Sequence, residues 1–476
     1  MTRKTVLAVD LGAESGRVMA VHFDGARLVT EELHRFVNPV TTISGTLYWD
    51  VLHLWRNIQQ GIDKGKAHNP VSIGVDTWGV DFGLLDRDGN LLANPVMYRD
   101  ARTNGMMEAV YAKVSRREVF EQTGIQMMQL NTLYQMMSLV EHKSPLLDVA
   151  QTFLTIPDLL HYWLTGAKVC EFSNATTTQM FNPRTGTWAR DMLGTLGIPT
   201  HILPEIVPPG TKLGSYDGIT VIAPAAHDTG SAVAGVPMTH KNSAYISSGT
   251  WSLVGLEVPN AIINDAAYEA NITNEGGVEN TYRLLKNVMG LWVLQQCRAQ
   301  WEREGAVYTY AELAELARTT PSAHTMIDVD DARFLAPGDH PSLIRAWCEE
   351  KGIAAPESHG AMARAVLESL AVKYRITLER LTTISGQSVE VLHIVGGGSQ
   401  NDLLNQLTAD AAGIPVQAGP VEATVLGNAA VQLIACGELS NITQARQIIR
   451  ESSLARDFQP IPDPFWDEAV ERMQQF

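Results

Sequence analysis

The first residues that could do chemistry lie near the N-terminus. The apolar run TVLAVD ends in Asp10, and the turn after it contains Gly12, Ser15 and Gly16, followed by Arg17. A carboxylate at the end of a buried strand is costly unless it is solvated or paired. Glycines in such a turn tolerate positive φ and let phosphate oxygens approach backbone N–H groups, where Asp10 could hold a hydrated Mg²⁺. A plain β-hairpin with a solvent-facing aspartate is an equally good interpretation of this segment alone.

A second carboxylate, Asp228, follows the apolar stretch VIAPAA and His227 near the middle of the chain. The small residues after it are typical of a helix, so Asp228 could be a helix N-cap, which is the usual role of aspartate in that setting. It could instead accept the proton of a substrate hydroxyl that attacks ATP. Phosphoryl transfer depends mainly on positioning and charge neutralisation, so one carboxylate with Mg²⁺ would be sufficient.

Two further turns contain small polar residues and glycines, at Ser247–Ser252 (SSGTWS) and Gly396–Asn401 (GGGSQN). The hydroxyls of the first could bind the β- and γ-phosphates of a nucleotide. The glycines of the second, between a strand and a helix, would let a flat ligand lie against the backbone. Each is a weak signal on its own, because small residues are common in turns and at helix starts.

The sequence lacks two familiar nucleotide-binding motifs. A dinucleotide fingerprint that begins at Gly12 would need glycines at positions 14 and 17, where Glu14 and Arg17 stand. The closest approach to a P-loop, Gly61–Ala67, is one residue short and lacks the final hydroxyl. A dehydrogenase is therefore disfavoured.

The elements that must position these residues follow a pattern that occurs twice. A strand–glycine-turn–strand unit opens the chain at 5–23, and a second one follows at 244–256. Apolar residues recur every three or four positions over 360–386, which predicts a long helix with one buried face. The sequence predicts further elements: a strand–turn–strand at 71–85, helices at 116–123, 133–142, 156–164, 402–412 and 466–474, a strand at 391–395, and a Pro/Gly-rich loop at 198–218. We therefore expect two related α/β domains, 1–240 and 241–476, with ligands at their interface.

Composition limits the classes of partner. The 476 residues suggest two domains or more, and 45% hydrophobic with 18% charged residues is typical of a globular protein. A net charge of −16 argues against nucleic acid or an anionic membrane as partners, whereas ATP stays possible because Mg²⁺ and backbone N–H groups neutralise phosphates locally. No stretch approaches the roughly 18 apolar residues of a membrane span, and no signal peptide is evident, so we expect a cytoplasmic protein. The four cysteines have no metal or redox spacing and are expected to be buried thiols.

The order of these segments resembles the hexokinase–actin–chaperone ATPase superfamily, and within it the carbohydrate kinases that phosphorylate glycerol, xylulose and related polyols. Longer motifs over nearly the whole chain are similar to those of the rhamnulokinases: DTWGVDF at 76–82, YRDARTN at 98–104, NATTTQ at 174–179, HDT at 227–229, SSGTWS at 247–252, NITNEGG at 271–277, LKNVMGLW at 285–292 and HIVGGG at 393–398. Asp158 stands where many relatives in the wider kinase family carry a lysine, a departure that rhamnulokinases share.

This resemblance implies an α/β fold of two ribonuclease H-like (actin-like ATPase) domains with an interdomain cleft. It implies an N-terminal domain (1–240) that binds the sugar and part of the phosphates, and a C-terminal nucleotide-binding domain (241–476). The implied reaction is the ATP- and Mg²⁺-dependent phosphorylation of L-rhamnulose at its C1 hydroxyl, in L-rhamnose catabolism. The implied metal-binding residue is Asp10, and the general base is Asp228. The implied ATP contacts are Ala13, Glu14, Ser15, Gly16, Arg17, Thr250, Gln295 and Gly397, and the implied sugar contacts are Gly79, His227, Asp228, Thr229 and Asn287.

Two alternatives to this interpretation remain. A non-catalytic sugar sensor could use the same fold, although no added DNA-binding segment or basic patch is evident in the sequence. A kinase for a neighbouring ketose such as fuculose or xylulose would differ only in the side chains that contact single hydroxyl groups. The sequence indicates no oligomeric state.

Overall fold

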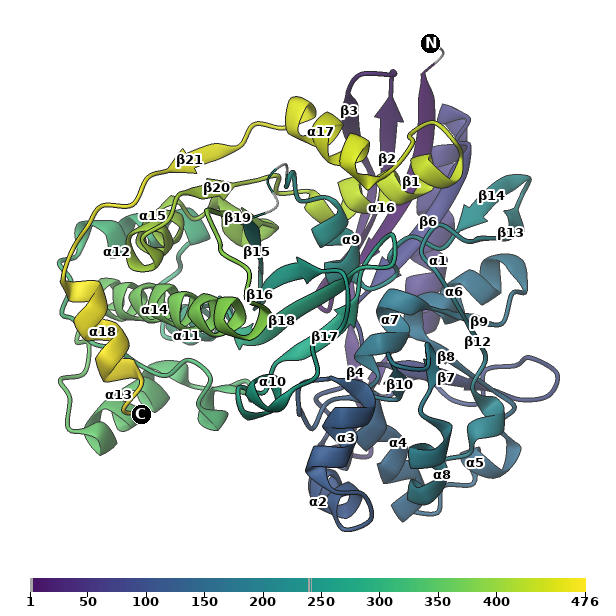
Figure 1. The fold of residues 1–476 in the computed structure, drawn as a ribbon, viewed down its shortest axis with the longest axis horizontal. Helices are drawn as coiled ribbons and strands as arrows, with labels where there is room; N and C mark the ends of the chain where they lie inside the picture. The colour runs from purple at the N-terminus through teal and green to yellow at the C-terminus, as the bar shows by residue number, and fades with distance from the viewer. Residues whose placement is uncertain (1–2, 239, 241) are drawn as a thin grey trace. The chain divides into compact units, whose positions relative to one another are not determined.

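The computed structural model describes residues 3–238, 240 and 242–476. The chain forms two compact units, each assembled from segments that are far apart in the sequence. The first unit comprises Met1–Pro237, Glu257–Leu284 and Ala423–Ser452. The second comprises Met238–Leu256, Leu285–Glu422 and Ser453–Phe476. Figure 1 labels the helices and strands of both.

The first unit is organised around a six-stranded mixed sheet of order β13-β14-β6-β1-β2-β3. Its strands β1, β2 and β3 are antiparallel neighbours, whereas β6 runs parallel to both β1 and β14. The strand bounds are β1 Lys4–Leu11, β2 Ser15–Phe23, β3 Leu28–Val37, β6 Ser72–Thr77, β13 Lys212–Tyr216 and β14 Ile219–Ile222.

Helices cover both faces of this sheet, which explains why β1 is apolar from Val6 to Val9 (Figure 1). Side chains alternate between the two faces of a strand. Val6 and Ala8 therefore pack with α9 (Asp228–Ala234), α16 (Ala423–Ala435) and α17 (Ile442–Ser452). On the other face, Leu7 and Val9 pack with α1 (Val51–Gly65) and α6 (Ile156–Thr165).

The rest of the first unit consists of short helices and strand pairs. The strand pairs are β4 Val40–Ile43 with β5 Thr46–Trp49, β7 Phe82–Leu85 with β8 Thr152–Thr155, β9 Val169–Glu171 with β12 Glu205–Val207, and β10 Phe181–Asn182 with β11 Thr187–Trp188. The helices are η1 Lys66–His68, η2 Ala101–Thr103, α2 Met106–Tyr111, α3 Arg116–Thr123, α4 Thr132–Glu141, α5 Leu146–Val149, α7 Phe172–Thr177, α8 Arg190–Leu196, η3 Thr200–Ile202 and α10 Asp265–Glu269. Strand β17, Thr273–Gly276, also belongs to this unit.

The second unit contains strands in the order β18-β16-β15-β19-β20-β21, with β15 parallel to β19 and antiparallel to β16. The strands are β15 Ser243–Ser248, β16 Trp251–Val258, β18 Tyr282–Met289, β19 Val391–Val395, β20 Val416–Ala418 and β21 Arg456–Phe458. The helices are α11 Trp292–Arg303, α12 Tyr310–Thr319, η4 Ala332–Phe334, α13 His340–Lys351, α14 His359–Ser385, η5 Gly397–Gln400, α15 Asp402–Ala412 and α18 Phe465–Met473. Among the described residues, no helix combines the length and the apolar character that a membrane span requires.

The elements expected from periodicity and turn residues are observed. Helix α3 begins and ends at the predicted residues, as does α15. The long helix α14 starts after the N-cap Ser358, whose side chain accepts a hydrogen bond from the Ala361 amide, and ends at Gly386, which has a left-handed φ of 70°. Both predicted glycine-turn hairpins are present, as β1–β2 and β15–β16.

The stretch 198–218 is not entirely the predicted loop, because it contains η3, β12 and β13. Strand β12 pairs with β9 and β13 with β14, so tertiary contacts supply the strand structure that the Pro- and Gly-rich composition disfavours. The predicted division between residues 240 and 241 stays a prediction, and Thr239 and Lys241 beside it lie outside the described residues.

Candidate active site

Asp10 lies near the carboxyl end of β1, and the hairpin register places Arg17 of β2 directly opposite it. Arg17 donates hydrogen bonds from Nε and Nη2 to Oδ2 of Asp10 at 2.9 and 2.8 Å. The side chain of Asp10 is only 13% exposed, so it is not the solvent-facing aspartate of a plain hairpin. Arg17 compensates its charge and fixes its orientation.

The two glycines of this turn do not have the positive φ that the sequence led us to expect. Neither Gly12 nor Gly16 is among the described residues with positive φ. A Cβ atom added at Gly16 would lie 2.5 Å from the Leu11 side chain and 2.6 Å from that of Phe36, so this glycine permits close packing within the hairpin. At Gly12 the nearest atom to such a Cβ is the Ser15 carbonyl oxygen at 3.5 Å, which leaves the turn itself accessible.

Asp76 is a carboxylate beside Asp10 to which the sequence assigned no role. The parallel register of β1 and β6 pairs the two residues, and each is the second-last residue of its strand. Asp76 is fully buried, and its Oδ2 accepts a hydrogen bond from Asn428 Nδ2 of α16 at 2.5 Å. Burial, followed by the charge of Asp10, raises the pKa of Asp76 well above its ordinary value.

Asp228 is the first residue of α9, directly after His227, which forms a parallel bridge with Thr77 at the end of β6. Its Oδ1 accepts hydrogen bonds from the amide and hydroxyl of Thr229 at 2.5 and 3.1 Å. The His227 residue occupies the N-cap position, so Asp228 lies inside the helix rather than capping it. Burial raises the pKa of Asp228; His227 lowers it and the charge of Asp10 adds to the rise.

Three carboxylates therefore gather at one edge of the sheet in the first unit. The charge of Asp10 contributes to the raised pKa of both Asp76 and Asp228. Oδ1 of Asp76 is buried and accepts no hydrogen bond from any described residue. Carboxylate oxygens that repel one another, one of them without a donor, are suited to a hard divalent cation such as Mg²⁺, directly or through water.

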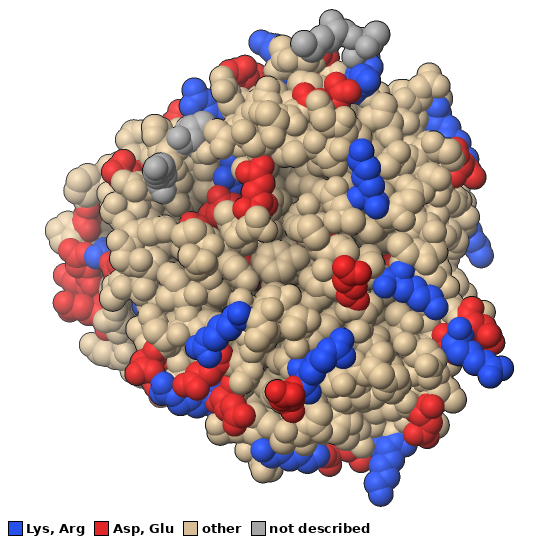
Figure 2. All heavy atoms as spheres, turned by 45° about the vertical axis from the view of Figure 1, so that its right-hand side comes forward, with Lys and Arg blue, Asp and Glu red and all other residues tan. Residues whose placement is uncertain are grey.

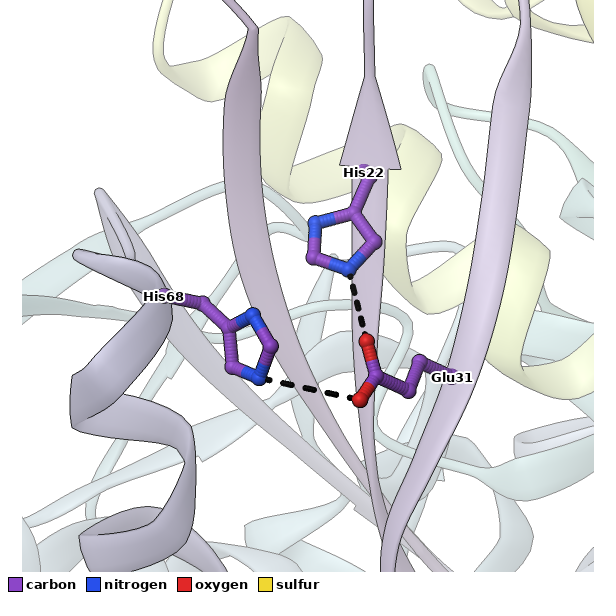
Figure 3. A group of neighbouring side chains, drawn as sticks. All are labelled: His22, Glu31 and His68. Atoms are coloured by element: carbon purple, nitrogen blue, oxygen red, sulfur yellow. Dashed lines mark hydrogen bonds and ion pairs between the residues drawn. The ribbon is translucent and has the colours of Figure 1, made fainter.

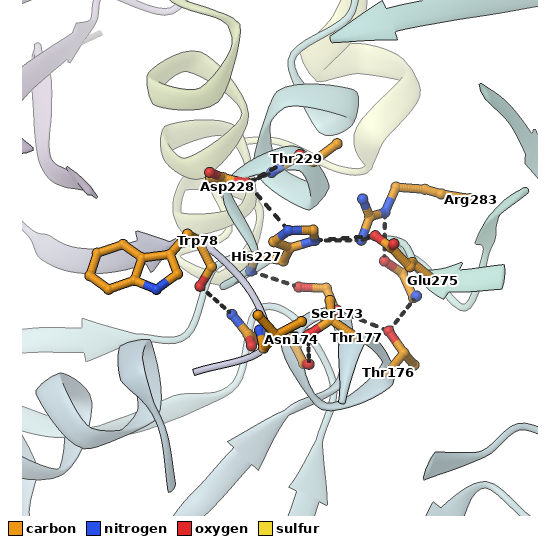
Figure 4. A network of polar contacts seen from close by, with 12 residues as sticks. Trp78, Ser173, Asn174, Thr176, Thr177, His227, Asp228, Thr229, Glu275 and Arg283 are labelled. Atoms are coloured by element: carbon orange, nitrogen blue, oxygen red, sulfur yellow. Dashed lines mark hydrogen bonds and ion pairs between the residues drawn. The ribbon is translucent and has the colours of Figure 1, made fainter. Parts of the chain in front are cut away.

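A buried network holds His227 beside Asp228 (Figure 4). Arg283 of β18 is fully buried, and its Nη2 lies 3.1 Å from His227 Nδ1 and 3.2 Å from Glu275 Oε2. Its Nε donates to the Gly276 carbonyl oxygen at 2.8 Å. His227 Nδ1 also lies 3.3 Å from Glu275 Oε2, so it faces both a guanidinium, which only donates, and a carboxylate, which only accepts. Nε2 of His227 lies 3.4 Å from Asp228 Oδ1.

The backbone amide of His227 is fixed, through the Ser173 hydroxyl, by the buried carboxylate of Glu171. Glu171 is the N-cap of α7 and accepts hydrogen bonds from the amides of Ser173, Asn174 and Ala226 at 2.9, 3.2 and 2.9 Å. The Ser173 hydroxyl donates to Glu171 and accepts from the His227 amide at 3.1 Å. The segment that carries Asp228 is therefore fixed to α7 (Figure 4).

Gly79 lies against this network. A Cβ atom at Gly79 would come within 3.0 Å of Thr177 Oγ1 and 3.2 Å of His227 Nε2, so a larger residue would press on the histidine. The next residue, Val80, has a φ of 69°, which is strained for a β-branched side chain. Strain of this kind concentrates at functional sites, where the surroundings enforce it. Thr132 Oγ1 donates to the Val80 carbonyl oxygen at 2.6 Å.

Asp158, the departure from the wider kinase pattern, is a buried structural group of α6. Its Oδ1 accepts a hydrogen bond from the Glu171 amide at 3.0 Å, and its Oδ2 accepts one from the Thr155 hydroxyl. Burial raises the pKa of Asp158 to about 8, and the charge of Glu171 adds to the rise. Asp158 is therefore mostly protonated at neutral pH.

This raised pKa predicts a pH-dependent stability. The folded state binds a proton at Asp158 more tightly than the unfolded state, so the stabilisation is complete below pH about 4 and is lost as pH rises to about 8. Asp158→Asn should remove that loss. In urea unfolding at pH 5, 6, 7 and 8, the stability of the wild type relative to the variant should fall by at most about 1.4 kcal/mol per pH unit. Parallel profiles for the two proteins would contradict the protonated state.

The remaining predicted residues lie in the second unit. Thr250 is in the β15–β16 turn, where its carbonyl oxygen accepts hydrogen bonds from the amides of Gly290 and Trp292 at 3.1 and 3.2 Å. A Cβ atom at Gly398 would lie 2.1 Å from Ser248 Oγ, so the glycine run at the end of β19 closely approaches the same hairpin. Beside it, Gly397 faces open space, with no described atom within 4 Å of such a Cβ.

Gln295 and Asn287 belong to the same unit. Gln295 is in the first turn of α11, and its amide donates to the Leu291 carbonyl oxygen at 2.8 Å. Its Oε1 is buried and accepts no hydrogen bond from any described residue, which suits a role toward a ligand donor. Asn287 lies on β18.

The predicted residues are divided between the two units: Asp10, Ala13–Arg17, Gly79 and His227–Thr229 lie in the first, and Thr250, Asn287, Gln295 and Gly397 lie in the second. The sequence assigned no role to Asp76, Glu275 or Arg283. Asp76 could have been found, because it ends a second apolar strand just as Asp10 ends the first. Glu275 lies in the NITNEGG motif, but nothing in that pattern indicates its contact with His227.

Comparisons with known proteins agree with this architecture. Residues 5–237 match the model of the N-terminal domain of the FGGY family of carbohydrate kinases, and residues 244–436 match its C-terminal domain. A rhamnulokinase of Bacteroides thetaiotaomicron is 42% identical over 480 residues, which covers 98% of both chains. Rhamnulokinases of Pectobacterium atrosepticum and Oceanobacillus iheyensis are 44% and 41% identical, each over 94% of this chain and over 92% and 96% of their own lengths.

Solved structures show the same fold at low identity. A xylulose kinase from Lactobacillus acidophilus superposes with a TM-score of 0.81 at 18% identity, covering 99% of this chain and 97% of the other. Plasmodium falciparum glycerol kinase superposes with a TM-score of 0.77 at 17% identity, covering 99% and 98%. The predicted α/β fold of two actin-like ATPase domains is thereby confirmed. The chain belongs to the FGGY family of carbohydrate kinases.

Proposed function

We propose that this kinase transfers the γ-phosphoryl group of ATP to the C1 hydroxyl of L-rhamnulose, giving L-rhamnulose 1-phosphate and ADP in L-rhamnose catabolism. The observation that carries the choice of substrate is the identity of 41–44% to proteins named rhamnulokinase over 93% or more of the chain. The xylulose and glycerol kinases among the solved structures are only 17–18% identical, so they support the fold and not the substrate.

In this proposal Asp228 is the general base. Its carboxylate accepts the C1 hydroxyl proton as the oxygen attacks the γ-phosphorus. An alcohol is a very weak acid, so the proton moves late, as the new P–O bond forms. The raised pKa of Asp228 makes it a better proton acceptor than an ordinary aspartate. His227, whose Nε2 lies 3.4 Å from Oδ1, opposes this rise in the pKa of Asp228.

Asp10 would hold Mg²⁺ through water, with Asp76 available on the adjacent strand. Bound there, the cation would neutralise charge on the β- and γ-phosphates. Arg17 keeps the Asp10 carboxylate in place through its two hydrogen bonds. The proposed ATP contacts are Ala13, Glu14, Ser15, Gly16, Arg17, Thr250, Gln295 and Gly397, and the proposed sugar contacts are Gly79, His227, Asp228, Thr229 and Asn287.

The Glu275–Arg283 network predicts that Glu275 acts through His227. Glu275→Gln should lower kcat by about 10-fold, because the amide removes the negative charge that faces His227 Nδ1 and Arg283. The KM for ATP should change little, because Glu275 lies beside the proposed sugar contacts. Steady-state kinetics with both substrates varied measure the split. Glu269→Gln, at an exposed position of α10, is the matched control, and equal kcat values for the two variants would remove Glu275 from the mechanism.

The partners and location follow from the reaction and the surface charge. The proposed partners are ATP and a ketose, without nucleic acid or membrane, and the proposed location is the cytoplasm. On the face drawn in Figure 2, basic and acidic side chains are interspersed rather than gathered by sign. Together with the net charge of −16, this supports small-molecule partners.

A panel of acceptors tests the proposed substrate. ADP release should be measured at saturating MgATP with L-rhamnulose, L-fuculose, D-xylulose and glycerol. We expect the highest kcat/KM for L-rhamnulose, by about tenfold or more, because a misplaced hydroxyl leaves buried polar groups unpaired. An equal or higher value for another ketose would move the assignment to that sugar. No turnover above the intrinsic ATPase rate with any acceptor would favour a sensor.

A further inference from the structure

A second group of potential metal ligands lies in the first unit, apart from the three aspartates. His22 of β2, Glu31 of β3 and His68 of η1 face one another (Figure 3). Nε2 of His22 lies 3.3 Å from Glu31 Oε2, and Nε2 of His68 lies 3.8 Å from Glu31 Oε1. One ligand atom from each of the three residues lies within 4.8 Å of the other two.

These separations fit a small tetrahedral cation. Zinc bonds to histidine nitrogen and carboxylate oxygen are about 2.0–2.2 Å long, which places tetrahedral ligand atoms about 3.3–3.5 Å apart. The His22–Glu31 pair at 3.3 Å already has this spacing, and His68 lies 3.8 Å from the other oxygen of Glu31. Two imidazoles and one carboxylate are a known zinc ligand set, and a fourth position would stay open to water.

The surroundings of His22 suit a metal ligand. Its Nδ1 lies 2.9 Å from the Thr5 hydroxyl oxygen, which can accept a hydrogen bond from Nδ1–H and so leave the Nε2 lone pair for a metal. The His22 side chain is 4% exposed, whereas Glu31 is 51% exposed and gives a cation access from solvent.

The cluster is remote from the proposed kinase chemistry. His22 pairs with Thr5 on β1, whereas Arg17 pairs with Asp10, five residues further along the strand. At about 3.3 Å per residue the two sites are roughly 16 Å apart. Strand β3 is the edge of the six-stranded sheet, and η1 joins α1 to β6. A metal bound here would tie the edge strand to that connection.

We propose that His22, Glu31 and His68 form a binding site for Zn²⁺ or a similar borderline divalent cation, separate from the proposed Mg²⁺ site. The bound cation would have a structural role, because it would link strand β3 to η1. The proposal rests on these three side chains and does not depend on the identity of the sugar.

Zinc titration into the chelator-stripped full chain, without an affinity tag, tests this site. Calorimetry should show one Zn²⁺ per chain, and Co²⁺ should give the visible absorption of a tetrahedral complex. Glu31→Gln and His68→Gln should each weaken binding at least about tenfold. His201→Gln, which changes an exposed histidine of the same unit, should leave binding unchanged. The melting temperature of the wild type should rise with Zn²⁺ and that of His68→Gln should rise less.

The site would be overturned if the wild type bound no stoichiometric Zn²⁺, or if Glu31→Gln and His68→Gln bound it as tightly as the wild type. The first result would reduce the cluster to an ion pair between Glu31 and two histidines. Neither result would affect the kinase assignment, which the acceptor panel tests separately.

Discussion

Asp228→Asn is expected to lower kcat by about 10²–10⁴ while MgATP still binds, because the variant keeps the shape of the side chain and loses the proton acceptor. The amide oxygen can still accept the hydrogen bonds from Thr229 that hold Oδ1 in the wild type. Steady-state kinetics and equilibrium binding of a nucleotide analogue measure the two quantities. Asp148→Asn, at an exposed position of the same unit, is the control for a lost aspartate charge.

The pH profile of this variant adds an independent readout. Asp228 must be deprotonated to accept a proton, so kcat/KM of the wild type should fall as pH decreases through its pKa. Because burial raises that pKa, the acid limb should lie above the ordinary aspartate value of about 3.9. The limb should be missing from the residual activity of Asp228→Asn. Near-wild-type turnover in a folded Asp228→Asn enzyme would remove this residue from the mechanism.

Asp10→Asn should raise the Mg²⁺ concentration needed for half-maximal rate by about 10–100-fold, as expected when a group that holds the hydrated cation is weakened. The asparagine oxygen can still accept a hydrogen bond from Arg17, so the hairpin should keep its register. Initial rates at fixed ATP over a range of free Mg²⁺ measure this change.

Asp24→Asn is the matched control for Asp10→Asn. Asp24 lies in the exposed turn between β2 and β3, where it accepts hydrogen bonds from the amides of Ala26 and Arg27. This control should keep the wild-type magnesium titration. An unchanged titration in Asp10→Asn would contradict the metal assignment, even if kcat fell for another reason.

The sequence was most informative where a local pattern determines structure. Alternating apolar residues around a glycine turn predicted both hairpins, and the apolar face over 360–386 predicted α14. Asp10 and Asp228 were predictable because a carboxylate directly after an apolar run is unusual and needs a partner or a task. The charge of Asp10 contributes to the raised pKa of Asp228, in agreement with that expectation.

Long-range packing accounts for what the sequence did not indicate. Asn428 and Arg283 reach the site from α16 and β18, elements far along the chain from the residues that they contact. Their side chains carry no local signal, because the same residue types on a solvated face would look identical. The same limit explains β12 and β13, whose pairing partners and not their own composition make them strands. The packing role of Gly16 also depends on Phe36 of the next strand, which turn chemistry alone could not predict.

The most direct measurement is a crystal structure of the enzyme with L-rhamnulose and a non-hydrolysable ATP analogue. We predict one carboxylate oxygen of Asp228 within about 2.6–3.2 Å of the C1 oxygen, on the side of the sugar that faces the γ-phosphate. A bound sugar whose C1 hydroxyl lay beyond reach of Asp228, or was held by another carboxylate such as Asp76, would contradict the proposed mechanism.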